Sequence, residues 1–221
     1  MSMRPLLFLL LAGLSLASCQ DAAQKPETAA SPGTGNTQDT SAVANSSPVD
    51  TAFQIEPGQH IGQVNLGDSP EKVHAALGDP DESDAAMGKS ISTWYSKGTG
   101  QERHRVDVYT VRENTGTAEE VVRVQQVRIT SPSFMVAEKQ VRVGSTLAEI
   151  RKSFPGVQAV ASYKPGNAPQ IYLYDSPAEG ISFEISGPDS TCVGIAIHPK
   201  GQSIADTYLP IYPNLQRLTP Q

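Results

Sequence analysis

The hydrophobic pattern of this chain contains one segment that occurs twice. Residues 64–78 read as a short apolar strand, a glycine, a residue able to cap a helix, and then apolar positions spaced four apart. Residues 141–155 repeat this order, shifted by 77 positions. Apolar residues spaced four apart lie on one side of a helix, so each copy predicts a strand followed by a helix of about three turns. Self-similarity at a fixed spacing indicates two copies of one structural unit.

Alternating apolar and polar residues after each predicted helix indicate strands. Within residues 120–130 the apolar positions change phase at Gln125 and Gln126, and a β-bulge there would restore a single apolar face. Residues 79–90 are small and acidic, which is typical of a loop. The predicted strands cover residues 91–95, 103–111, 120–130, 170–174, 180–185 and 191–198.

These elements together predict an α+β fold. It would consist of two tandem repeats, residues 53–135 and 136–200, each with one helix and antiparallel strands. The strands would form a layered sheet with both helices on one face. The C-terminal tail, residues 201–221, has prolines at 210, 213 and 220 and is expected to be irregular.

The N-terminus has the pattern of a targeting segment. A basic residue, Arg4, precedes an apolar stretch that is too short to span a bilayer as a helix. The stretch ends in Leu16-Ala17-Ser18-Cys19, which resembles a bacterial lipobox. This resemblance implies that residues 1–18 are removed as a signal peptide. It also implies that Cys19 is acylated, as by palmitate, and anchors the protein to a lipid bilayer. An ordinary secretory signal with a chance cysteine is the alternative.

Composition separates a tether from a folded region. Residues 19–52 consist mostly of small and polar residues, which cannot bury enough apolar surface to fold, so a flexible tether is expected. The rest of the 221-residue chain supplies enough hydrophobic residues for a substantial core. The net charge of −6, without a basic run, argues against nucleic acid as a partner.

One motif suggests catalysis, and the duplicated segment argues against it. Ser69 and Lys72 match the Ser-x-x-Lys pattern of penicillin-recognising enzymes. The corresponding residue of the second copy is Thr146, followed by Glu149, which is the pattern of a helix capping box. We therefore interpret Ser69 as a helix cap and predict no catalytic residue. The four histidines lack metal-ligand spacing, so neither a metal site nor a cofactor is predicted.

The predicted strands have one apolar phase and one polar, aromatic phase. The apolar phase should cover the helices and contains Val106, Val108, Ile171, Leu173, Ile181, Phe183 and Ile185. The other phase should form an open face. Tyrosine and arginine are enriched in binding hot spots, although tyrosines also pair across ordinary solvated sheets. The candidate binding residues on this face are Tyr95, Arg105, Tyr109, Arg128, Tyr172 and Tyr174.

A longer pattern resembles known envelope proteins. It reads Val64-x-Leu66-Gly67-x-Ser69-x-x-x-Val73-x-x-x-Leu77-Gly78-x-Pro80, with Trp94-Tyr95 after it. Behind a lipobox and a tether, this pattern resembles the β-lactamase inhibitor protein fold and the small SmpA/OmlA lipoproteins of outer-membrane assembly. The resemblance implies a non-enzymatic protein at the outer membrane, facing the periplasm, which presents a sheet face to an envelope protein or a cell-wall component. An inhibitor of an envelope enzyme is the alternative, and a hydrolase with an unrecognised site is less favoured.

The lipobox generates a first prediction. Cys19→Ala should abolish incorporation of labelled palmitate, because the substitution removes the sulfur to which the lipid is attached. Metabolic labelling followed by immunoprecipitation measures this, and Cys192→Ala serves as the control that should label like the wild type. Equal labelling of the Cys19→Ala protein would contradict the anchor.

Overall fold

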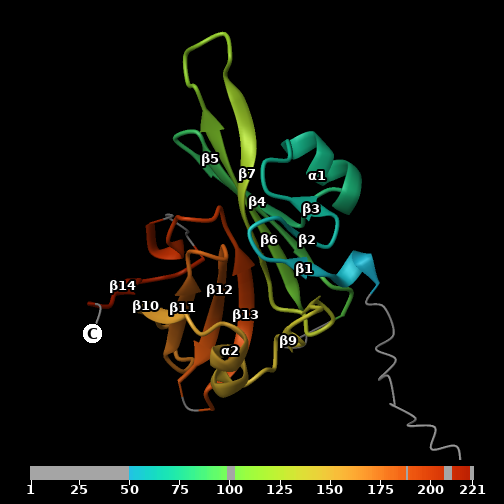
Figure 1. The fold of residues 1–221 in the computed structure, drawn as a ribbon. Coiled ribbons are helices and arrows are strands. Elements are labelled where there is room, and N and C mark those ends of the chain that lie inside the picture. The colour runs from blue at the N-terminus through green and yellow to red at the C-terminus, as the bar shows by residue number, and fades with distance from the viewer. Residues whose placement is uncertain (1–49, 99–102, 188, 207–210, 220–221) are drawn as a thin grey trace, which may run out of the picture. The chain divides into compact units, whose positions relative to one another are not determined.

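The computed structural model describes residues 50–98, 103–187, 189–206 and 211–219 (Figure 1). The predicted signal peptide, Cys19 and nearly all of the predicted tether lie outside these residues. Within them, no helix is long and apolar enough to cross a membrane.

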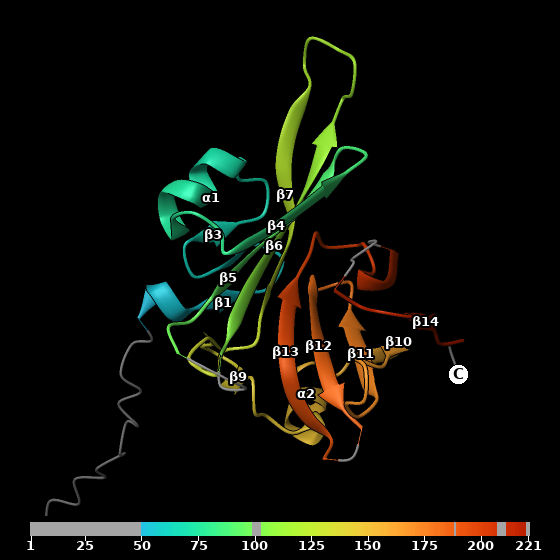
Figure 2. The same cartoon turned by 180° about the vertical axis from the view of Figure 1, so that it is seen from behind.

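The main element is a nine-stranded antiparallel sheet with the order β14-β10-β11-β12-β13-β7-β6-β5-β4 (Figures 1 and 2). Ladders of five or more residue pairs join most neighbouring strands, but β13 meets β7 through only three pairs and β14 meets β10 through two. The strands are β4 (Glu82–Ala86), β5 (Lys89–Tyr95), β6 (Arg105–Glu113), β7 (Val121–Ile129), β10 (Gln158–Tyr163), β11 (Ile171–Ser176), β12 (Ile181–Ser186), β13 (Thr191–Ile197) and β14 (Gln216–Arg217).

Small elements surround the sheet. The helices are α1 (Pro70–Leu77) and α2 (Leu147–Ser153). In Figure 1, α2 lies in front of β12 and β13, and in Figure 2 it lies behind them. The remaining elements are the 3₁₀ turns η1 (Thr51–Phe53) and η3 (Ile204–Asp206), a three-stranded sheet of β1 (Ile55–Glu56), β2 (His60–Ile61) and β3 (Val64–Asn65), and the pair β8 (Met135–Val136) and β9 (Val141–Arg142).

The predicted α+β fold of two helix-plus-strand repeats is wrong. The helices have only eight and seven residues, about two turns each, and each fully buries a single residue, Val73 and Ile150. The sheet crosses the predicted boundary between the repeats, because β7 of the first pairs directly with β13 of the second. Helices this short cannot provide the cores of two separate units. The described fold is mostly β, with one nine-stranded sheet as its main element.

The predicted acidic loop at residues 79–90 is also wrong, because it contains β4. The turn between β4 and β5 consists of Met87 and Gly88, whose φ angles are 51° and 75°. Two consecutive positive φ angles are typical of the tight turns that join hairpin strands. All five residues of β4 are exposed, so the strand lacks the apolar alternation by which a half-buried strand is recognised.

Several local predictions are confirmed. Thr146 and Glu149 form the capping box of α2, each side chain accepting a hydrogen bond from the other's backbone N–H. Ser69 caps α1 in the same position. The bulge in β7 is present: Tyr109 pairs with Gln126 and the next residue, Thr110, with Val124, so Gln125 is the extra residue. All six predicted strands are found, with small shifts at their ends.

Two hydrophobic clusters mark the two faces of the sheet. We call the side covered by the helices the first face; its core includes Val108, Phe183 and Ile195 from the sheet, and Ile150 and Phe154 from the α2 region. The second face is covered by residues of the C-terminal tail. Its core contains Tyr109, Ala161, Tyr163, Ile171, Leu173 and Ala196 from the sheet, and Ile204, Ala205 and Tyr212 from the tail.

The capping box generates a second prediction. Thr146→Ala should lower the free energy of unfolding by about 1 kcal/mol, because it leaves an N–H group of the first helical turn without a partner. Ser69→Ala should cost a similar amount, while Thr146→Ser retains the hydroxyl and should cost little. Urea unfolding followed by circular dichroism measures all three. An unchanged midpoint for Thr146→Ala would contradict the role of the cap.

Candidate binding site

The structure does not place the six predicted binding residues on one face. Tyr172 and Tyr174 were assigned to the second face, but Tyr174 pairs with Phe183 and packs against the first-face core. The Arg151 guanidinium of α2 lies 5.5 Å from the centre of the Tyr174 ring. Ile171 and Leu173, predicted to cover the helices, belong instead to the second-face cluster.

The assignment of β11 was wrong because both of its phases are hydrophobic. The strand alternates isoleucine and leucine with two tyrosines, so the sequence does not distinguish the buried side. Residues directly opposite each other in an antiparallel pair share a face, and the pairing with β12 sets Leu173 opposite Glu184. Tertiary pairing therefore decides the orientation of Tyr172 and Tyr174.

The second face was predicted to be open, and at Tyr109 and Arg128 it is not. Both residues lie on this face, and they are only 4% and 8% exposed. Tyr212 of the tail reaches the same region and donates a hydrogen bond to Glu184, 3.2 Å between the oxygens. The prolines of the tail indicated irregular structure, but gave no sign that the tail packs on the sheet.

A buried network of charges crosses the second face. Arg128 donates to Glu184 through Nη2 at 2.7 Å and through Nε, and to Asp107 through Nη1 at 2.8 Å. Arg105 donates to the other oxygen of Asp107, 3.0 Å from its Nε. Tyr163 donates to Glu184 at 2.9 Å. The network therefore joins β6, β7, β12 and β10, and through Tyr212 also the tail.

The groups of this network are held in defined ionisation states. Burial lowers the pKa of Arg128, but its neighbours, Glu184 first and Asp107 among the others, together outweigh this effect, so the pKa lies well above its ordinary value. Burial raises the pKa values of Tyr163 and Tyr212, and the negative charge of Glu184 adds to the shift. The arginine stays charged and both phenols stay protonated, as required for donors to a carboxylate.

Gly194 makes room for the contact between Arg128 and Glu184. It lies opposite Glu184 on β13, the strand that separates β12 from β7. A Cβ atom at this position would lie 2.8 Å from Oε2 of Glu184. The carboxylate cannot move away without losing its bonds to Arg128, so glycine is required here for steric reasons.

A second buried cluster holds the beginning of the tail. Asp175 of β11 is fully buried and accepts hydrogen bonds from Ser203 Oγ at 2.8 Å and the Ile204 backbone N–H at 2.9 Å. Its other oxygen lies 2.9 Å from Nε2 of His198. Sequence analysis missed this cluster. The available signal was a single charged residue in a strand that otherwise lacks charge, which also marks Glu184.

A groove remains accessible on the second face beside β4. It consists of two adjoining hollows of about 380 and about 240 Å³, which share Asp84 and Ile91; we call it the β4 groove. Ile91 and Tyr109 contribute to its larger, mainly apolar part. The other lining residues are Ala86, Met87, Lys89 and Ser90 in the larger hollow, and Glu82, Ser83, Thr93, Arg105 and Ile211 in the smaller.

Two of the predicted binding residues lie where this groove meets the charge network. Arg105 is held by Asp107, and its guanidinium lies 5.8 Å from the centre of the Tyr95 ring. Tyr95 donates a hydrogen bond to Glu82 at 3.1 Å, and Arg103 lies 4.2 Å above its ring. Burial and the neighbouring Glu82 raise the pKa of Tyr95. Of the six candidates, Tyr95, Arg105 and Tyr109 are therefore brought together at the groove.

The other reactive side chains have structural roles. Lys72 pairs with Asp68, 2.7 Å between Nζ and Oδ1, while Ser69 accepts the backbone N–H of Lys72 as a cap. Cys192 is buried in the first-face core, and burial raises the pKa of its thiol. In the part of the chain that the structure describes, no group of three or more histidine, cysteine or acidic residues could hold a metal ion.

Comparisons with known proteins add little. No family model matches the sequence, and no curated protein is similar to it. Among solved structures, the chain is similar to a cysteine-rich secretory protein (SAV1118) from Staphylococcus aureus, at 14% identity and a TM-score of 0.39 over 77% of this chain. It is also similar to the DUF4309 family protein YjgB from Bacillus subtilis, at 15% identity and a TM-score of 0.37 over 65% of this chain and 88% of that one.

A third similar structure is an extracellular protein containing an SCP domain from Bacillus anthracis, at 14% identity and a TM-score of 0.41 over 71% of this chain. The chain spans 58% of the length of the staphylococcal protein and 50% of the length of the B. anthracis protein. At TM-scores of this size, the similarities carry no argument about function.

The charge network generates a third prediction. Arg128→Met should lower the free energy of unfolding by about 3–5 kcal/mol, because it leaves the buried carboxylate of Glu184 without a cation and removes one of the two arginines bound to Asp107. Arg112→Met is the matched control: Arg112 pairs with Glu120 at the surface, 2.7 Å between the charged atoms, and its loss should cost less than about 1 kcal/mol. Urea unfolding measures both. Equal losses would contradict the central role of Arg128.

Proposed function

We propose that this protein is a lipid-anchored, non-enzymatic protein of the bacterial cell envelope that binds a partner protein through the β4 groove. The observation that carries the proposal is the groove itself. It is a hollow with an apolar floor, lined by charged residues, and it lies beside a strand at the edge of the sheet. In the proposed arrangement, acylated Cys19 lies in the outer membrane and a tether leads to the folded domain in the periplasm.

The composition of the groove fits a protein partner. Protein interfaces combine an apolar centre with a polar rim and are enriched in tyrosine, methionine and arginine. Here Ile91 and Tyr109 supply an apolar surface, and Met87 is 98% exposed at its margin. Arg105 lines the smaller hollow, where Tyr95 donates a hydrogen bond to the lining residue Glu82. The sequence alone left a cell-wall component open as well. The apolar floor and the exposed methionine favour a protein.

Arg105 is suited to recognition because it is already ordered. Two of its nitrogens bond to the carboxylate of Asp107, which is itself fixed by Arg128. A side chain held in place before binding loses little conformational entropy when a partner docks. The charge network is mostly buried, but through Asp107 it holds the Arg105 side chain in place at the groove.

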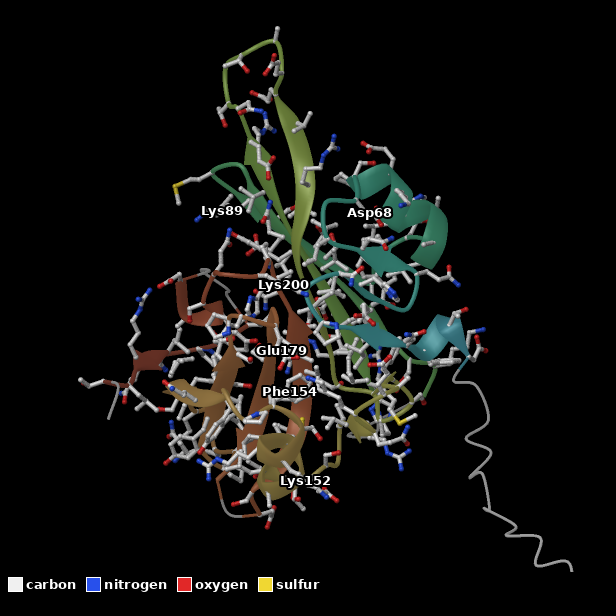
Figure 3. The ribbon with its side chains drawn as sticks, in the orientation of Figure 1. Asp68, Lys89, Lys152, Phe154, Glu179 and Lys200 are labelled. Atoms are coloured by element: carbon white, nitrogen blue, oxygen red, sulfur yellow. The ribbon has the colours of Figure 1, made fainter. Side chains whose placement is uncertain are left out.

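A site-specific crosslinking experiment tests this proposal. A photo-crosslinking amino acid replaces Lys89, at the margin of the groove, or Lys152, on α2 (Figure 3). Both lysines are exposed, so neither replacement should disturb the fold. In cells, irradiation should join the Lys89 variant to one envelope protein, while the Lys152 variant should not capture it. Capture of the same proteins from both positions, or of none from Lys89, would contradict the proposal.

A further inference from the structure

We propose that the outer edge of β4 binds an extended segment of the partner as an additional strand, and that this segment alternates basic and apolar residues on the side facing the groove. This inference rests on the proposed function and specifies the chemistry of the partner. The sheet ends at β4 within the described residues, and all five residues of the strand are exposed. In an antiparallel pair, every second residue directs its N–H and C=O away from the neighbour, so β4 offers backbone groups to another strand.

The register of β4 determines which side chains an added strand would meet. Glu82, Asp84 and Ala86 lie opposite Thr93, Ile91 and Lys89, on the side of the sheet that carries the groove. Alternate residues of an added strand would lie beside the same three positions. Because Ala86 is small, a long apolar side chain beside it can extend over β4 into the hollow lined by Ile91 and Tyr109.

The charge of this edge favours basic residues at the other two positions. Asp81, Glu82 and Asp84 form no ion pair with other described residues. Lysine or arginine beside Glu82 and Asp84 would form cross-strand pairs of opposite charge, which stabilise neighbouring strands. A basic segment is therefore complementary to the edge, and an acidic one is repelled.

The same charges argue against two other occupants. In an antiparallel pairing of β4 with a second copy of itself centred on Asp84, two Asp84 side chains would face each other, and like charges in this position destabilise a pair. The N-terminal tether, residues 20–52, contains a single basic residue, Lys25, and four acidic ones. Neither a second copy nor the tether matches the edge as well as a basic partner segment does.

Met87 provides an independent indication of a ligand at this edge. It is 98% exposed and has a φ angle of 51°, a conformation that favours glycine or asparagine. An exposed methionine here costs conformational energy and gains no packing within the described domain. Strain of this kind is concentrated at binding sites, and a flexible thioether adapts well to apolar partners. Contact of Met87 with the apolar residue of the bound segment accounts for its position.

N-methylated peptides test the strand pairing directly. The probe is a fluorescent threonine-rich peptide with arginines and one leucine at alternate positions, added to the full chain in detergent. One derivative is N-methylated at every second residue and the other at the remaining residues. Only alternate N–H groups of an added strand face β4, so one derivative should lose about tenfold or more in affinity and the other should bind like the probe. Equal behaviour of the two derivatives would overturn the proposal.

Substitutions locate the same binding event on the protein. Met87→Asn should leave stability unchanged or raised, because asparagine tolerates a positive φ, and should weaken peptide binding about fivefold. Asp84→Asn should weaken it by a similar factor, while Glu119→Gln, an exposed acid in the turn between β6 and β7, is the charge-matched control and should have no effect. Undiminished binding by both groove variants, or a dimer that competes with the peptide, would overturn the proposal.

The two proposals fail in distinguishable ways. If the Lys89 variant captures a partner and the methylated peptides bind alike, the binding function stands and strand addition is wrong. If one methylated derivative loses binding as expected and Lys89 captures no partner in cells, the edge accepts the peptide and the proposed function is wrong.

Discussion

The fold depends on the ion pairs between Arg128 and the carboxylates of Asp107 and Glu184. Only three residue pairs join β7 to β13, so the backbone ladder between the two halves of the sheet is short at this point. Arg128 bridges the junction, with Asp107 on β6 and Glu184 on β12. Charges removed from water are costly unless they are paired and hydrogen-bonded. Removing one of these three groups would leave a charge buried without its full set of partners, so their pairing supports the junction.

The two buried clusters together determine which part of the second face remains accessible. Glu184 accepts hydrogen bonds from Tyr163 and from Tyr212 of the tail, and Asp175 holds the beginning of the tail through Ser203 and Ile204. These contacts cover the centre of the face. The accessible part is the β4 groove, where Arg105, bonded to Asp107 of the network, is one of the lining residues. In the proposed function, Arg105 therefore has both a structural role and a role in recognition.

The acidic edge strand can be understood as a device for selectivity. Free sheet edges invite pairing with other chains, and charged side chains on the edge limit this. In β4 the charges of Glu82 and Asp84 oppose pairing with another copy of the same strand, while they attract a segment of opposite charge. A repulsive element that also defines the accepted partner is a common way to obtain specificity. In the proposed complex, the exposed Met87 adds an apolar contact to these charge interactions.

The sequence by itself determined the local features of this protein. The caps at Ser69 and Thr146 and the bulge at Gln125 were predicted because they depend on residues close together in the chain. The turn at Met87 and Gly88, which joins β4 to β5, was not predicted because its residues do not have the usual composition of a hairpin turn. Without the turn, β4 was not recognised as a strand.

Only the tertiary structure decided which residues form the candidate site. It set the orientation of Tyr172 and Tyr174, the burial of Tyr109 and Arg128, and the position of the tail over the second face. Each of these depends on contacts between segments far apart in the chain, such as Arg128 with Glu184. An alternating strand has two equivalent phases until a distant partner buries one of them, and for that physical reason the pattern of the strands alone could not choose.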